Sequence, residues 1–79
     1  MQTTQQLMTA GIRYRLAILG KPQAWLAKEI GISSFALSRR MSGRTHFDVE
    51  LGDEIATALG TDFPSLISLP QMAEQSLAA

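Results

Sequence analysis

The segment that most constrains this chain runs from Gln23 to Gly43 and reads QAWLAKEIGISSFALSRRMSG. Its first half carries an apolar stripe at helical spacing, formed by Leu26, Ala27 and Ile30. Gly31 follows as a residue that can adopt the left-handed conformation typical of a helix end. Ser33 is then a suitable N-cap for a second helix that ends at about Met41. The segment therefore predicts two short helices joined by a tight turn.

The segments before and after this pair are also expected to be helical. A capping box at Thr3 opens a helix that Gly20 closes, and Asp48 caps a later helix that Gly60 closes. Gly52 inside the later helix costs about 1 kcal/mol relative to Ala unless a neighbouring backbone packs closely there. The expected buried stripes are Met8, Ile12, Leu16 and Leu19 in the first of these helices, and Phe47, Leu51, Ile55 and Leu59 in the other.

The last expected helix is short. Asp62 caps it, Leu66 and Ile67 face inward, and Pro70 interrupts it. The segment 70–79 is expected to be a C-terminal tail that is partly disordered or takes part in dimerisation. Val and aromatic residues are few, which favours helix over sheet, and 79 residues suit one domain. These patterns predict an all-α domain.

Charge is distributed unevenly along a chain whose net charge is zero. All seven Lys and Arg residues lie at or before Arg44, where Glu29 is the single acidic residue; the other acidic residues all follow. Such asymmetry suggests one basic and one acidic face. Because charges act locally, within about 10 Å at moderate salt, a basic face can bind DNA on a neutral molecule.

Several classes of function find no support in the sequence. There is no cysteine, and the lone His46 has no carboxylates arranged around it, so we expect neither a metal nor a cofactor. No glycine-rich phosphate loop and no catalytic signature is present, so we do not expect an enzyme. No apolar run has the length that spans a membrane, and we expect no signal peptide, because residues 1–11 contain no basic region followed by an apolar one. We expect a soluble protein of a bacterial host cytoplasm, associated with the nucleoid.

The outer face of the helix 33–41 is unusual. On a helical wheel, one face holds Ser34, Phe35, Ser38, Arg39 and Ser42. Leu37 and Met41 form a narrow buried stripe, with Ile32 just before the helix. A merely solvated face accounts for the serines and the arginine, but less well for a phenylalanine beside them. The face suits a surface that enters a groove.

The spacing of these residues resembles the helix-turn-helix signature of the Cro/lambda-repressor family, also called the XRE family. The matching positions are Gln23, Leu26-Ala27, Gly31-Ile32-Ser33, Leu37-Ser38-Arg39 and Gly43. Ala27 is small, so that the two helices can cross closely. The resemblance implies a five-helix lambda-repressor-like helix-turn-helix domain, which we place at residues 1–69. It also implies a sequence-specific transcriptional regulator of phage or prophage origin.

The resemblance further implies roles for individual residues. Ser34, Phe35, Ser38 and Arg39 are expected to read base edges in the major groove, with Arg39 on a guanine and Phe35 on a thymine methyl. The alternatives are an ion pair of Arg39 with Glu29 and core packing of Phe35. The expected phosphate contacts are Gln23, Lys21, Arg40, Ser42, Arg44, Thr45 and His46.

Two positions depart from the family pattern. The family often has an apolar residue where this chain has Arg40, and an acidic residue where it has Met41. We expect Met41 to join the core. Arg40 should turn to the edge, towards a phosphate or towards the acidic helix 48–59.

The expected partner is a double-stranded DNA operator, bound by a homodimer, with no small-molecule ligand. The dimer surface is expected to use Leu66, Ile67, Leu69 and Met72. Two alternatives remain open. One is an antitoxin-like autorepressor whose acidic half holds a toxin, and the other is a protein-interaction adaptor or anti-repressor that does not bind DNA.

Overall fold

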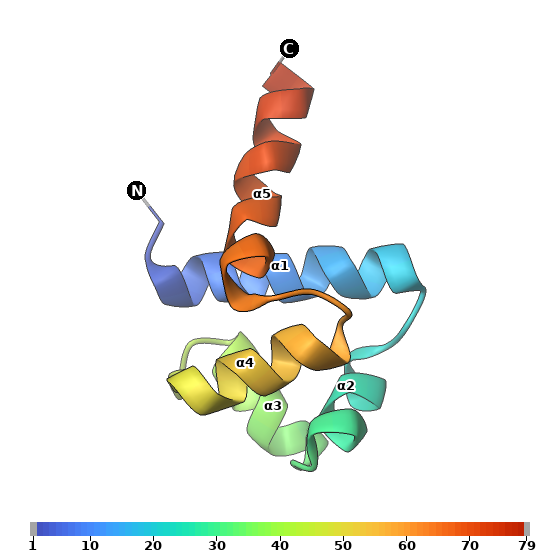
Figure 1. The fold of residues 1–79 in the computed structure, drawn as a ribbon. Helices are drawn as coiled ribbons and strands as arrows, with labels where there is room; N and C mark the ends of the chain where they lie inside the picture. The colour runs from blue at the N-terminus through green and yellow to red at the C-terminus, as the bar shows by residue number, and fades with distance from the viewer. Residues whose placement is uncertain (1, 79) are drawn as a thin grey trace.

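The computed structural model describes the backbone of residues 2–78 and the side chains of residues 2–70. The described part contains five helices and no strand, so the prediction of an all-α fold is confirmed. The helices are α1 (Thr4–Leu19), α2 (Gln23–Ile30), α3 (Ser34–Met41), α4 (Val49–Ala58) and α5 (Phe63–Ala78). Figure 1 shows α2, α3 and α4 on one side of α1, while most of α5 projects on the other side.

Four of the five described helices, all except α2, begin at a residue whose side chain caps them. Thr3, Ser33, Asp48 and Asp62 each accept a hydrogen bond from the backbone N–H three residues later, over distances between 2.7 and 3.2 Å. Each bond satisfies one of the N–H groups that a helix start leaves without a partner. All four predicted N-caps are therefore confirmed.

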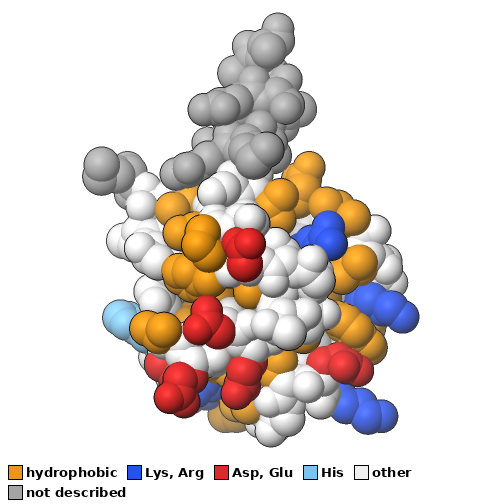
Figure 2. All heavy atoms as spheres, in the orientation of Figure 1, with side chains coloured by type: hydrophobic (Ala, Val, Ile, Leu, Met, Phe, Trp, Pro, Cys, Tyr) orange, Lys and Arg blue, Asp and Glu red, His pale blue; other side chains and the backbone are white. Residues whose placement is uncertain are grey.

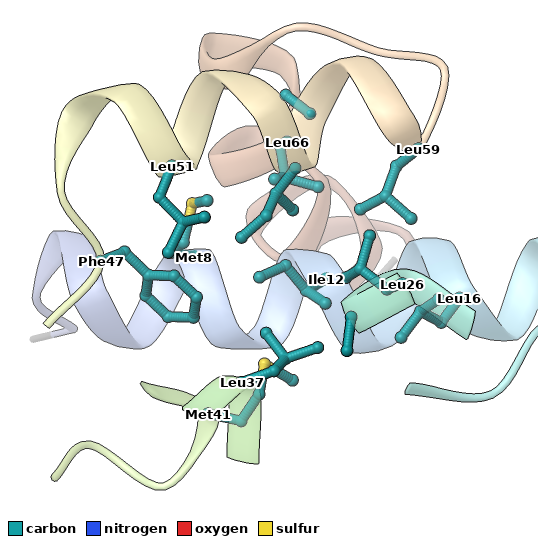
Figure 3. Packing of buried hydrophobic residues seen from close by; sticks show 13 residues of the cluster. Met8, Ile12, Leu16, Leu26, Leu37, Met41, Phe47, Leu51, Leu59 and Leu66 are labelled. Carbon is teal, nitrogen blue, oxygen red and sulfur yellow. The ribbon is translucent and has the colours of Figure 1, made fainter. Parts of the chain in front are cut away.

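The core collects one buried face from every helix (Figure 3). Its members are Met8, Ile12, Leu16, Leu26, Ala27, Leu37, Met41, Phe47, Leu51, Ile55, Ala56, Leu59 and Leu66. The predicted stripe of α4 is confirmed, as are the first three members of the stripe of α1. Leu19 was expected in the same stripe, and that prediction is wrong, since its side chain is 38% exposed. Leu19 is the last residue of α1. This end of α1 extends past the helices that pack against the middle of α1 (Figure 1).

The turn between α2 and α3 forms as the glycine predicts. Gly31 has a φ of 76°, and its N–H donates to the carbonyl of Lys28 over 3.3 Å. The next N–H, of Ile32, donates to the carbonyl of Ala27 over 3.0 Å. This left-handed closure turns the chain sharply into α3, and Ala27 is fully buried beneath the crossing. Leu37 faces the core, as predicted.

Helix α5 continues through Pro70 to Ala78, so the predicted interruption at Pro70 is wrong. A proline removes one hydrogen bond from a helix because it has no N–H to donate to the carbonyl four residues earlier, here that of Leu66. The backbone of α1 packs against that same carbonyl at Gly11. The two helices approach closely at this carbonyl because Gly11 has no side chain.

Candidate nucleic-acid interface

The outward face of α3 carries the residues that were expected to read bases. Ser34, Phe35, Ser38 and Arg39 are all exposed. The ring of Phe35 is 71% exposed, so the alternative that it packs in the core is wrong. The Arg39 guanidinium carbon lies 5.7 Å from the centre of the Phe35 ring. This distance is within the range of a cation–π contact, and the two side chains therefore project together from one turn of the helix.

A small hollow of about 160 Å³ lies beside this pair. Its lining residues are Phe35, Ser38, Arg39, Ser42 and Arg44. The structure thus brings three of the four expected base-reading residues together with two of the expected phosphate contacts. The lining contains two guanidinium groups and no carboxylate, which favours an anionic partner.

The loop after α3 is folded back onto the end of that helix. The carbonyl of Arg39 accepts hydrogen bonds from the backbone N–H of Arg44 over 2.9 Å and from that of Thr45 over 3.2 Å. It also accepts one from the Ser42 hydroxyl over 3.1 Å. Three donors on one carbonyl hold the loop against α3. The Arg44 side chain is consequently placed next to Arg39 on the exposed side.

The start of α2 provides a second group of expected phosphate contacts. Gln23 is the first residue of α2, and Pro22 at the N-cap position gives the helix no side-chain cap. N–H groups at such a helix start favour an anion. The Lys21 ammonium lies 5.7 Å from the ring centre of Trp25, which is half-buried as expected. Gln23 and Lys21 line neither the hollow at Phe35 nor the cavity that Arg40 lines.

Of the two directions expected for Arg40, the one towards α4 is wrong, and contact with a phosphate stays a prediction. Its side chain is half-buried and lines a cavity between α1 and the end of α3, as does His46. One of its terminal nitrogens, Nη1, donates to the carbonyl of Ala36 over 3.2 Å. Its neighbour Met41 is buried in the core as expected, and the preceding residue, Arg40, is directed towards α1.

Sequence reasoning missed the structural role of Arg15. Its Nε donates to the carbonyl of Leu59 over 2.8 Å, at the C-terminal end of α4. A cation there satisfies a free carbonyl and complements the helix dipole. Because 44 positions separate the two residues, no local signal in the sequence could have indicated this contact.

The acidic side chains gather elsewhere on the molecule. Figure 2 shows several of them on the face that carries α4. Glu29 lines a cavity of about 570 Å³ together with Asp53 and Glu54 of α4. Glu29, the alternative ion-pair partner of Arg39, therefore lies beside other carboxylates. Arg39 lines the hollow at Phe35 instead.

The residues expected at a dimer surface differ in their exposure. Leu66 is fully buried within the monomer and has no surface to offer a second chain. Ile67 and Leu69 are half-buried and pack against the core. The side chain of Met72 lies outside the described residues.

Two further kinds of site were searched for in the described part of the chain. No group of His, Asp or Glu side chains there is placed to hold a metal ion. No helix in that part has both the length and the apolar character needed to cross a membrane.

Comparison with known proteins found a solved structure that is similar to this chain. No protein-family model matches the sequence, and no curated protein matches it. The crystal structure of the clp gene regulator ClgR from Corynebacterium glutamicum matches with a TM-score of 0.74 and 25% sequence identity. The match covers 98% of this chain and 88% of the other. This chain is similar in fold to a bacterial gene regulator. The match therefore shows that the helical fold of this chain is shared with that protein.

Proposed function

We propose that this protein is a DNA-binding transcriptional regulator of the Cro/repressor type, which places α3 in the major groove of an operator. The observation that carries the proposal is the exposed pair of Phe35 and Arg39 on the second helix of a helix-turn-helix. A large ring exposed beside a guanidinium suits contact with a partner better than contact with water. The similarity to a gene regulator supports the same conclusion.

The side chains of α3 divide naturally between base contact and close approach. Arg39 has the reach and the paired donors to bind O6 and N7 of a guanine, and Phe35 can pack on a thymine methyl. Ser34 and Ser38 have short side chains, so they do not prevent α3 from lying deep in the groove. The neutral chain then binds DNA through one local surface.

Phosphate contacts would hold α3 in position. Ser42, Arg44 and Thr45 belong to the loop that is bonded to the end of α3, so a phosphate held there is in a fixed relation to Arg39. Gln23 and Lys21 at the start of α2 supply a second contact, at a helix N-terminus that favours anions. Such contacts orient the protein, whereas base contacts select the sequence.

The proposed form on DNA is a symmetric dimer in the cytoplasm of a bacterial host, in a phage or prophage setting. Two copies would bind half-sites about 34 Å apart, one helical turn of DNA. Of the residues first expected at the dimer surface, Ile67 and Leu69 keep partial exposure in the monomer and remain candidates. The operator would then be an inverted repeat.

The test is selection of bound sequences from a random duplex library at about 150 mM salt, where non-specific phosphate binding is weak. We expect enrichment of an inverted repeat. Enrichment of a single half-site would support sequence-specific DNA binding and contradict binding as a symmetric dimer. No enrichment of any sequence would contradict the proposal and would favour a protein partner, such as a toxin, on the acidic face.

A further inference from the structure

A cavity of about 500 Å³ lies between the first half of α1 and the C-terminal end of α3. Three of its lining residues can carry a positive charge: Arg13, Arg40 and His46. No Asp or Glu lines it. Its volume falls within the range of small-molecule sites, which is about 300–1,000 Å³. The chemistry of the lining therefore suits an anion of modest size.

Arg40 has hydrogen-bonding capacity that the described part of the protein does not use. Its Nε is buried and has no hydrogen-bond partner there, while Nη1 is bonded to a carbonyl of its own helix. Buried N–H groups of charged side chains are rarely left without an acceptor, because their desolvation is costly. Because Arg40 also lines the cavity, its guanidinium group is placed to donate to a ligand oxygen there.

Other donors border the same cavity. The side-chain oxygen of Gln6 is bonded to the Thr3 backbone N–H, so its NH₂ group remains available to a ligand. Thr9 adds a hydroxyl. Gln5 also lines the cavity, but both of its amide atoms are bonded to the main chain of Phe47. Donors and positive charge thus come from two different helices, and guanidinium groups match the geometry of phosphate oxygens.

We propose that this cavity binds a phosphate group, held by Arg13 and Arg40. The phosphate has two potential sources. One is a free phosphorylated small molecule, which the sequence did not lead us to expect. The other is a phosphodiester of bound DNA, since Ser42 lines both this cavity and the hollow at Phe35. The second source rests on the proposed DNA binding, and the first does not.

The first arm of the test needs no DNA. The full chain, labelled with ¹⁵N, is titrated with inorganic phosphate against chloride at equal ionic strength and followed by NMR. We expect saturable shifts at the amides of Ala10 and Gly43, which line the cavity, and none at Gly60. Arg13→Gln and Arg40→Met should each weaken phosphate binding at least tenfold. Lys28→Gln removes the same charge from an exposed position of α2 and should leave phosphate binding unchanged.

The second arm measures duplex DNA affinity against salt concentration for the same variants. If a DNA phosphate enters the cavity, Arg13→Gln should reduce the salt slope by about 1. Saturable phosphate binding that the two arginine variants lose supports a free ligand, and a reduced slope supports a DNA phosphate. If neither arm responds, the proposal is overturned. Should Arg40→Met fail to fold by circular dichroism, Arg13→Gln decides both arms. The proposed regulator function fails on a different result, the lack of sequence enrichment.

Discussion

The backbone of Gly11, in the middle of α1, packs directly against the carbonyl group of Leu66 in α5. A Cβ atom built on Gly11 would collide with the Leu66 carbonyl oxygen and lie 3.1 Å from its carbonyl carbon. Pro70 has no N–H to donate to this carbonyl, which therefore lacks its usual partner in the helix. The approach of α1 to α5 depends on a residue without a side chain.

We expect Gly11→Ala to destabilise the fold by about 1–3 kcal/mol, the typical cost of overpacking. The backbone of α5 must move to make room, and the higher helix propensity of alanine does not offset this. The measurement is the free energy of unfolding in urea. Gly52→Ala is the matched control, because a Cβ there would meet the ring of Phe63 at 3.2 Å, and a side chain can shift. That variant should stay within about 1 kcal/mol of the parent. Equal losses for the two variants would contradict the role of the Leu66 carbonyl.

A second long-range contact joins Gln5 of α1 to Phe47 ahead of α4. The Gln5 amide donates to the Phe47 carbonyl over 3.1 Å and accepts from the Phe47 N–H over 2.7 Å. Gln5→Ala should cost roughly 1–3 kcal/mol, since two partly buried hydrogen bonds are lost. Gln2→Ala, at an exposed position, is the control and should change little. Hydrogen exchange at the Phe47 amide should accelerate only in the first variant, and unchanged protection there would refute the contact.

The N-cap of α5 leads us to expect a pH dependence. Hydrogen bonds from the backbone and side chain of Ser65 lower the pKa of Asp62 from its ordinary value. A group whose pKa is lowered by folding contributes stability that is complete above its unfolded pKa. That contribution is lost as the pH falls through the folded pKa. Asp62→Asn keeps a capping oxygen but does not titrate, so its unfolding free energy should fall less steeply on the acid side. If the free energies of unfolding of the two proteins fell in parallel as the pH was lowered, a contribution from Asp62 would be excluded.

On the DNA side, Arg39→Ala should cost about 1–3 kcal/mol of operator affinity and relax the preference at one base position. The physical reason is the loss of a paired contact to a guanine edge. Binding is measured by fluorescence anisotropy on the selected operator and on variants changed at each position. Lys28→Ala, an exposed control outside the α3 face, should affect all sequences alike. An unchanged sequence profile for Arg39→Ala would remove Arg39 from the set of base-reading residues.

Phe35→Ala separates DNA binding from folding. Because the ring is 71% exposed, its removal should leave the free energy of unfolding nearly unchanged, within about 0.5 kcal/mol. Operator affinity should nevertheless fall, most strongly at a thymine of the half-site. Thermal unfolding and anisotropy on the same samples make the comparison. A large loss of stability with intact DNA binding would show that the ring serves the fold instead.

Local rules were sufficient for the capped helix starts and for the helix ends that a glycine closes. A capping bond joins residues three positions apart, as at Ser33 and Asp62, and a left-handed glycine such as Gly31 closes a helix within a few residues. The outward face of α3 followed from helical periodicity alone, and Phe35 is exposed where the wheel placed it. All of these features depend on residues close together in the chain.

The remaining features depend on which surfaces meet after the helices have formed. By itself, the sequence determined the helices, their caps and the exposed face of α3, because those depend on neighbours within about one turn. Only the tertiary structure decided that Arg40 faces α1, that Arg15 caps α4 and that α5 continues through Pro70. Each of these needs a partner from a distant part of the chain, and the position of that partner is set by the packing of the whole core.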